Sequence, residues 1–229
     1  MKGVTHLTVG GLTGGLFLAV SAGAGSVSIE LSNYTVYSLL VIASSAVGGL
    51  GPDVDMAHSK GGKFFRKAMR SILVLSAIFL IVLFFLPPTG INFFDGAIAM
   101  GARIDRGMLI ILSAFCLLVL ALIEKSKHRG FTHTFVSLLV IALPLAFMLA
   151  TEISFVGANI VVSAQIGFLI GWFSHLIIDT FNRGGVPWLW PISKKKFKIM
   201  RIVTGSDAEN RFVTYTMIFF IMCYAIIVL

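Results

Sequence analysis

The chain contains seven runs of mainly apolar residues, and each run approaches the length that a helix needs to cross a membrane. Hydrocarbon about 30 Å thick requires about 20 residues of α-helix. The seven runs are Leu7–Gly25, Tyr34–Leu50, Ser71–Leu86, Gly107–Ile123, Phe135–Ala150, Val156–Ile178 and Phe212–Leu229. This pattern predicts a polytopic bundle of transmembrane helices.

Composition excludes the other broad classes of protein. Of the 229 residues, 57% are hydrophobic and only 12% are charged, whereas soluble domains are about 45–50% apolar and about 25% charged. A chain this apolar does not stay solvated as a disordered polymer. Its two cysteines, Cys116 and Cys223, lie inside apolar runs and do not indicate a disulfide scaffold. We therefore predict an all-α transmembrane bundle of about seven spans, forming a single domain over residues 1–229.

The basic residues divide unequally between the two sides of this bundle. If the N-terminus lies in the cytoplasm and the spans alternate, all of the 18 Lys and Arg residues except Arg103 and Arg106 fall on the cytoplasmic side. Positively charged loops stay in the cytoplasm, so this orientation is predicted over its reverse. The net charge of +8 then favours contact with anionic lipid headgroups. No nucleic-acid partner is expected, because topology explains most of the charge.

Histidines and aspartates gather on the same predicted side. They are His6, His58, His128, His133, His175, Asp53, Asp55 and Asp179. The orientation rests on Lys and Arg alone, so this agreement is an independent check. Ionisable residues in or near spans are costly and are functional candidates by default. The sequence therefore predicts one site, built by four segments that are distant along the chain.

Two of these segments carry carboxylates. His175 and Asp179 are four residues apart, so they share a helix face and can hold one ion or two adjacent ions. A capping aspartate with an interfacial histidine is the alternative. Asp53 and Asp55 follow Pro52, which prevents the second helix from continuing normally. In an extended segment their side chains point to opposite sides, and the alternative is a solvated turn.

A third segment, His128-Arg129-Gly130-Phe131-Thr132-His133, precedes the fifth run. Thr132 is the predicted N-cap of that helix and would place His133 in its first turn. Arg129 offers a planar donor fork suited to phosphate, beside a helix N-terminus that also favours anions. A basic loop with incidental histidines is the alternative.

The fourth segment, Thr5-His6, begins the first run, with Thr5 as a candidate cap. A lone histidine at a helix entrance is usually only interfacial, so His6 gains weight from the other segments. His58 lies in a Ser-Lys-Gly-Gly loop, where a solvated histidine is the favoured interpretation. Small residues favour close helix packing on two spans: Gly10, Gly11, Gly14 and Gly15 on the first, and Ser163, Gly167 and Gly171 on the sixth.

Taken together, the segments predict a metal site with seven candidate ligands: His6, Asp53, Asp55, His128, His133, His175 and Asp179. A mixed imidazole and carboxylate set fits one to three divalent ions of zinc or manganese. Structural zinc more usually recruits cysteine, so metal-assisted hydrolysis is expected. Asp55 or His128 would ligate the metal, or would orient or deprotonate the attacking water. Arg129 would stabilise charge on phosphoryl oxygens.

Four motifs in this order resemble the YdjM-like family of bacterial membrane-bound predicted metal-dependent hydrolases: Thr5-His6, Pro52-Asp53-Val54-Asp55, His128-Arg129-Gly130-Phe131-Thr132-His133 and His175-x-x-x-Asp179. The resemblance covers nearly the whole chain. It implies a site that faces the cytoplasm from the bacterial cytoplasmic membrane. The family is distantly similar to the zinc-dependent phospholipase C and single-strand nuclease superfamily, which implies zinc and phosphoester chemistry.

The expected function is hydrolysis of a phosphoester in a membrane lipid or a lipid-linked substrate. One alternative is a transporter or metal permease, which needs ionisable groups near mid-membrane, where only Asn159 and Gln165 are conspicuously polar. Another is a non-enzymatic membrane protein with a structural metal. Trp188 and Trp190, beside the basic stretch 194–198, predict an interfacial anchor, with plain topology determinants as the alternative.

Overall fold

The computed structural model describes residues 1–23, 31–55, 130–150 and 158–228, together with single helical residues between 67 and 122. Every regular element in these ranges is helical. The elements are α1 (Gly3–Gly23), α2 (Leu31–Gly48), the 3₁₀-helices η1 (Gly51–Asp55) and η2 (Phe131–His133), α6 (Phe135–Ala150), α7 (Ala158–Thr180) and α8 (Asp207–Val228). The β pairing in the described part is limited to two isolated bridges. The all-α prediction is confirmed for this part of the chain.

Four of the described helices, α1, α2, α7 and α8, are long and apolar enough to cross a membrane. Helix α6 has the predicted bounds, but its apolar window, Phe135–Ala146, is shorter. The predicted runs Ser71–Leu86 and Gly107–Ile123 lie outside the described residues, apart from single helical positions. The prediction of a helical membrane protein is therefore confirmed, whereas the total of about seven spans and the cytoplasmic N-terminus stay predictions.

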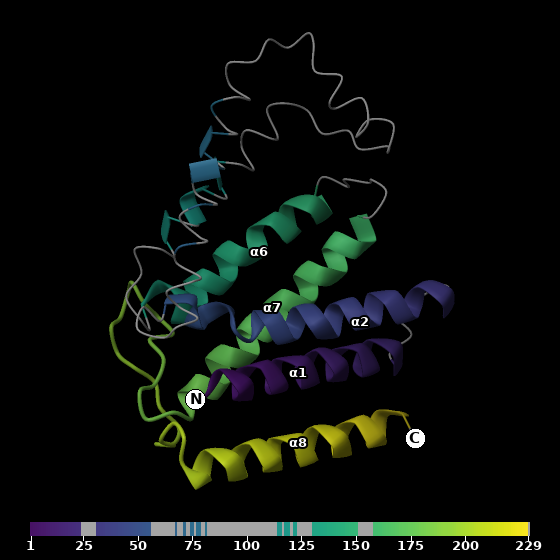
Figure 1. Ribbon diagram of the computed structural model, residues 1–229, viewed down its shortest axis with the longest axis vertical. Helices are drawn as coiled ribbons and strands as arrows, with labels where there is room; N and C mark the ends of the chain where they lie inside the picture. The colour runs from purple at the N-terminus through teal and green to yellow at the C-terminus, as the bar shows by residue number, and fades with distance from the viewer. Residues whose placement is uncertain are drawn as a thin grey trace.

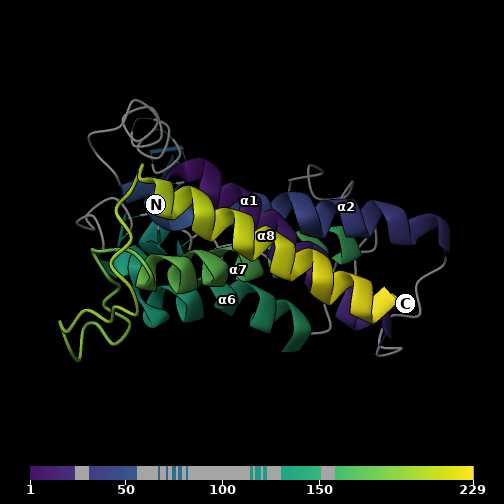
Figure 2. The ribbon, with the colours of Figure 1, turned by 90° about the horizontal axis from the view of Figure 1, so that it is seen from below.

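Helix α1 lies between α2 and α8, and α7 packs against both α1 and α2 (Figure 1). Helix α6 contacts α7, and the view from below shows α8 crossing the outside of the bundle (Figure 2). The outer helix faces are apolar and exposed, as at Leu39 of α2 and Ile226 of α8. Apolar faces of this kind suit contact with lipid hydrocarbon.

Small residues allow the closest of these contacts. A Cβ atom on Gly167 or Gly171 of α7 would overlap the backbone of α2 at Val41 or Ser45, so the predicted small-residue face of this helix is confirmed. On α1, a Cβ atom on Gly10 would lie 2.6 Å from the carbonyl oxygen of Ser45. These contacts draw the ends of α1, α2 and α7 together at one end of the bundle.

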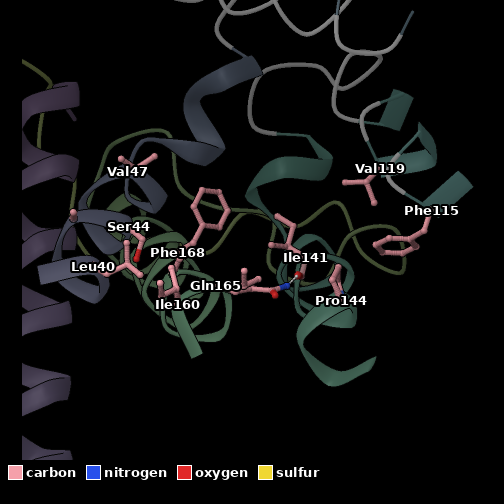
Figure 3. A pocket seen from close by; sticks show the side chains of 13 residues that line it. Leu40, Ser44, Val47, Phe115, Val119, Ile141, Pro144, Ile160, Gln165 and Phe168 are labelled. Carbon is pink, nitrogen blue, oxygen red and sulfur yellow. Dashed lines mark hydrogen bonds between the residues drawn. The ribbon is translucent and has the colours of Figure 1, made fainter. Parts of the chain in front are cut away.

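An open apolar cavity of about 930 Å³ lies between α2, α6 and α7 and is also lined by Phe115 and Val119 (Figure 3). Its lining is hydrophobic except for Ser44 and Gln165, and the Gln165 side chain donates a hydrogen bond to the carbonyl oxygen of Ile141 at 3.5 Å. Phe168 lines the cavity seven residues before His175. At 1.5 Å per residue, the cavity therefore begins about 10 Å along α7 from that histidine.

Candidate metal centre

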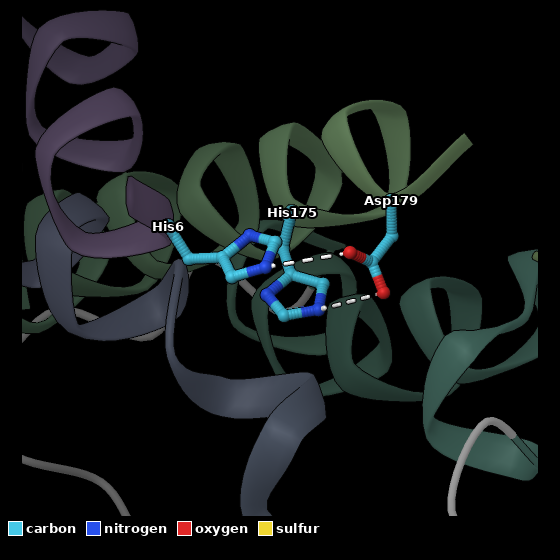
Figure 4. A group of neighbouring side chains, drawn as sticks. All are labelled: His6, His175 and Asp179. Atoms are coloured by element: carbon cyan, nitrogen blue, oxygen red, sulfur yellow. Dashed lines mark ion pairs between the residues drawn. The ribbon is translucent and has the colours of Figure 1, made fainter. Parts of the chain in front are cut away.

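Five predicted ligands meet at one end of the bundle: His6 of α1, Asp53 of η1, His133 of η2, and His175 and Asp179 of α7. The three histidines are fully buried and Asp179 is 1% exposed, while 12% of the Asp53 side chain is exposed. Figure 4 shows His6, His175 and Asp179 pointing toward one another. The structure thus brings together residues from all four of the predicted segments.

Two imidazole nitrogens of this group lie close to each other and at similar distances from two carboxylate oxygens. The Nε2 atoms of His133 and His175 are 3.3 Å apart. Oδ1 of Asp53 lies 3.6 Å and 3.7 Å from these two nitrogens, and Oδ2 of Asp179 lies 3.7 Å and 3.8 Å from them. Tetrahedral zinc with bonds of about 2.0–2.2 Å separates its ligands by about 3.3–3.6 Å. The spacing between the two nitrogens, and between each nitrogen and each carboxylate oxygen, is therefore close to the spacing of ligands around a divalent ion.

The orientation of His175 is set by the backbone of the turn that follows α2. Its Nδ1 atom lies 2.6 Å from the carbonyl oxygen of Gly49. Because a carbonyl oxygen only accepts, Nδ1 carries the proton and donates it. The lone pair of the neutral ring is then on Nε2, which faces His133 and both carboxylates. Metal-binding histidines commonly donate their second N–H to a backbone carbonyl in this way.

His133 lies in η2, ahead of α6, and its Nδ1 atom is 3.0 Å from Oγ1 of Thr132. The prediction that Thr132 caps α6 is wrong. Thr134 has the extended backbone of an N-cap residue, with φ −125° and ψ 159°, and its hydroxyl oxygen accepts the Ser137 N–H at 3.1 Å. The 3₁₀ turn of residues 131–133 places the cap two residues later, so His133 precedes the helix and Thr132 contacts the imidazole.

His6 lies in the first turn of α1 and stacks on His175, with ring centroids 3.7 Å apart and an interplanar angle of 19°. Its Nε2 atom is 3.4 Å from Oδ1 of Asp179, while Oδ2 of the same carboxylate faces His133 and His175. Both His6 nitrogens are buried without a hydrogen bond. A buried polar group without a partner is costly, and a cation beside Nε2 would remove the part of that cost that belongs to this nitrogen.

Asp53 reaches the site from a 3₁₀-helix. The prediction of an extended Asp-x-Asp segment is wrong, because Gly51–Asp55 forms η1, and the Asp53 N–H donates to the carbonyl oxygen of Leu50 at 3.2 Å. The indole ring of Trp172 packs on Gly51, where a Cβ atom would lie 2.5 Å from ring carbons. Glycine therefore allows α7 to approach close to the start of η1.

Other predicted residues are not placed. His58, His128 and Arg129 lie outside the described residues, and only the backbone of Asp55 is described. The proposed roles of Asp55 and His128 in activating water, and of Arg129 in binding a phosphoryl group, therefore stay predictions.

Glu209 is a buried residue that no predicted motif contains. It is 1% exposed, and its Oε1 atom accepts the Lys2 N–H at 2.6 Å and the Thr5 hydroxyl at 2.9 Å. Its Oε2 atom accepts the Gly205 N–H at 2.6 Å. Thr5 is therefore a donor to α8 and does not cap α1. The Ser-x-x-Glu spacing of residues 206–209 is typical of a capping box, but that pattern does not predict the contact with α1.

The arrangement fits a divalent cation held by imidazole and carboxylate groups. Two overlapping groups have suitable spacing: His6, His175 and Asp179, and Asp53, His133 and His175. Because Nδ1 of His175 is committed to Gly49, its Nε2 atom can serve only one ion. The two carboxylate oxygens of Asp179 face the two groups separately, so this side chain can connect them.

Comparison with known proteins agrees with the prediction of a membrane protein. The family model described as "YdjM inner membrane protein" matches residues 1–229. No curated protein and no solved structure matches the chain. Since the match extends over the whole sequence, the chain belongs to the YdjM inner membrane protein family.

Proposed function

We propose that this protein is a metal-dependent hydrolase of a phosphoester in a membrane lipid or a lipid-linked substrate. Its site would face the cytoplasm from the bacterial inner membrane. The observation that carries the proposal is the position of Oδ1 of Asp53 and Oδ2 of Asp179, each 3.6–3.8 Å from the Nε2 atoms of both His133 and His175, which are themselves 3.3 Å apart. Hydrolases commonly use a divalent ion held by such a set.

Each residue of the site would have a separate role in such a hydrolase. The Gly49 carbonyl holds His175 in the tautomer that directs Nε2 inward, and Asp179 supplies two oxygens to two neighbouring groups. A bound divalent ion would supply Lewis acidity toward a phosphoryl oxygen. Asp53 is the most exposed of the five grouped residues, and substrate is therefore expected to enter from its side.

Two features support a substrate that carries a hydrocarbon chain. The grouped residues lie at the end of helices that are long and apolar enough to cross a membrane. The apolar cavity between α2, α6 and α7 (Figure 3) begins about 10 Å from His175 along the same helix. A phosphate at the site and an acyl or isoprenyl chain in the cavity would then belong to one molecule.

Substitutions on α7 test the proposal. His175→Ala and Asp179→Ala should each remove bound metal, measured by elemental analysis, and hydrolysis of a panel of lipid phosphates, measured as product released. Ser174→Ala is the matched control, because this buried serine donates to the Gly171 carbonyl of its own helix at 2.8 Å. Unchanged metal content in the His175 and Asp179 variants would refute the assignment.

Burial favours a structural metal as the second candidate function. The three histidines and Asp179 are buried almost completely, and a closed coordination shell is typical of structural sites. In this case chelation should lower the melting temperature of the purified protein while no phosphoester is hydrolysed at any metal concentration. Hydrolysis that a chelator abolishes and added metal restores would exclude this alternative.

A further inference from the structure

The connection between α7 and α8, residues 181–206, combines positive charge with exposed apolar side chains. It contains six basic residues and no acidic residue. Four of the basic residues form a lysine cluster: Lys194, Lys195, Lys196 and Lys198. All four are exposed, and none takes part in an ion pair between described residues. The charge of the cluster is therefore available to an external partner.

Large apolar side chains are exposed beside this cluster. Ile192 is 91% exposed, Ile199 67% and Met200 51%. Trp188 and Trp190, which the sequence predicts as anchors, are both partly buried. The ring of Trp190 packs near Phe131, and the ring of Trp188 packs near Phe173. The most exposed apolar groups of the connection are thus not aromatic, and Phe197 is exposed to only 40%. Exposed apolar side chains surrounded by cations suit the boundary between headgroups and acyl chains.

Backbone hydrogen bonds hold the connection against the end of the bundle. The Ile199 N–H donates to the Thr180 carbonyl oxygen at 2.8 Å, and the Phe135 N–H donates to the Trp188 carbonyl oxygen at 3.0 Å. Val186 is fully buried and pairs with Phe197 through two backbone bonds of 2.9 Å and 3.0 Å. The charged and apolar side chains are therefore presented by an ordered segment that is attached directly to α6 and α7.

We propose that residues 181–206 form a docking surface for anionic phospholipid headgroups. Both ends of the segment join helices long and apolar enough to cross a membrane, so the segment starts and ends near a bilayer surface. Electrostatic attraction between lysine and anionic lipid acts within a Debye length of about 10 Å. Charge complementarity thus selects anionic lipid, and the exposed aliphatic groups select a bilayer over a free phosphate ion. The proposal depends neither on the metal centre nor on hydrolysis.

The charge of the surface is tested by lipid binding to the purified full-length protein. The lysine-cluster variant, K194Q/K195Q/K196Q/K198Q, is compared with wild type by native mass spectrometry during titration with phosphatidylglycerol or phosphatidylcholine. Each lysine near an anionic surface contributes about fivefold in affinity, so the variant should bind phosphatidylglycerol at least about tenfold more weakly. Binding of phosphatidylcholine should not change.

A control variant removes four positive charges from another segment by changing each residue to glutamine: Lys60, Lys63, Arg66 and Lys67. This variant should retain more of the phosphatidylglycerol affinity than the lysine-cluster variant. Equal losses in both variants, or wild-type affinity in the lysine-cluster variant, would overturn the proposal. Both variants must melt at the wild-type temperature, and because the changed lysines of the cluster are exposed, their loss should not disturb the fold.

The depth of the surface is tested at Ile192. In a chain carrying Cys116→Ser and Cys223→Ser, an environment-sensitive fluorophore is attached to Ile192→Cys. Its emission should shift to shorter wavelength in nanodiscs of phosphatidylglycerol relative to nanodiscs of phosphatidylcholine, and the lysine-cluster substitutions should abolish the difference. An aqueous emission spectrum in both lipids would contradict the proposal and would assign the surface to a soluble acidic partner.

Discussion

Two buried carboxylates lie at the same end of the bundle, and their surroundings differ. Glu209 and Asp179 are each 1% exposed. Glu209 accepts two backbone N–H groups and one hydroxyl at 2.6–2.9 Å. Asp179 faces the Nε2 atoms of three histidines at 3.4–3.8 Å, and the Met1 amino group lies 3.4 Å from its Oδ1 atom. One carboxylate is surrounded by short hydrogen bonds, and the other by three imidazoles at ligand spacing and by the Met1 amino group.

The difference separates a structural carboxylate from a candidate metal ligand. Burying a charge is costly unless hydrogen bonds or a counter-charge compensate it. For Glu209 the chain itself supplies the compensation and joins α8 to the start of α1. At Asp179 the nearest imidazole nitrogens include Nε2 of His175, which the Gly49 contact leaves without a proton. A cation satisfies that nitrogen and the carboxylate together, so equal burial does not imply equal function.

The largest expected effect separates the two carboxylates directly. Asp179→Asn should lower the affinity for zinc at least about hundredfold, because it replaces a charged ligand atom and changes the electrostatics of both groups. Glu209→Gln keeps the shape of the side chain, and the hydrogen-bond partners of Glu209 are backbone N–H groups and a hydroxyl, not imidazoles. This substitution should therefore change the zinc affinity by less than a few fold. Competition with a chromophoric chelator measures both values. Equal losses in the two variants would show that the comparison is wrong.

The second effect is on stability and has the opposite pattern. Glu209→Ala removes the acceptor of three hydrogen bonds, and unsatisfied donors cost about 1–3 kcal/mol each when buried. Water can reach part of this site, since the bonds from Lys2 and Gly205 are only part-buried. The metal-free protein should therefore lose about 2 kcal/mol of unfolding free energy. Denaturation in detergent measures the unfolding free energy. The control is metal-free Asp179→Asn, which should lose less unfolding free energy than Glu209→Ala.

The sequence predicts most helices because their apolar runs are long, and it predicts their polar ends less well. Helix α6 has the predicted bounds, whereas α1 begins at Gly3 and α8 at Asp207, four and five residues before the predicted Leu7 and Phe212. Both starts are polar, so hydropathy does not include them. The contact between Glu209 and the start of α1 stabilises both ends, and only tertiary packing creates it.

The candidate site was predictable in its residue types and less so in its geometry. Histidine and aspartate at four span ends indicated convergence, since charge asymmetry placed all four ends on one side. A backbone carbonyl such as that of Gly49 leaves no signal in the sequence. Its hydrogen bond with His175, which orients the ring, can be seen only once α2 and α7 are packed together. The 3₁₀ turns at Asp53 and His133 were also missed, because short turns depend on the packing around them.

A smaller effect tests whether a residue that contacts a metal ligand, but is not itself a ligand, changes the metal affinity. Thr132→Val keeps the size of the side chain but removes the oxygen that lies 3.0 Å from Nδ1 of His133. Loss of such a supporting contact typically lowers metal affinity about 10–100-fold. We expect about tenfold, because His133 stays packed in η2. Chelator competition measures the change, and an unaltered affinity would mean that this contact does not orient the ring.

The smallest effect compares the helix caps on the two sides of the site. Thr134 is fully buried, accepts the Ser137 N–H and donates to the Phe131 carbonyl oxygen at 2.7 Å. Ser206 likewise donates to a carbonyl oxygen, that of Val203, at 2.7 Å, but it accepts the Glu209 N–H at only 3.4 Å and is partly exposed. Loss of a cap costs about 0.5–2 kcal/mol, so Thr134→Ala should destabilise the protein by about 1 kcal/mol more than Ser206→Ala. Because Thr134 follows His133 directly, Thr134→Ala should also weaken metal binding, whereas Ser206→Ala should affect thermal stability alone.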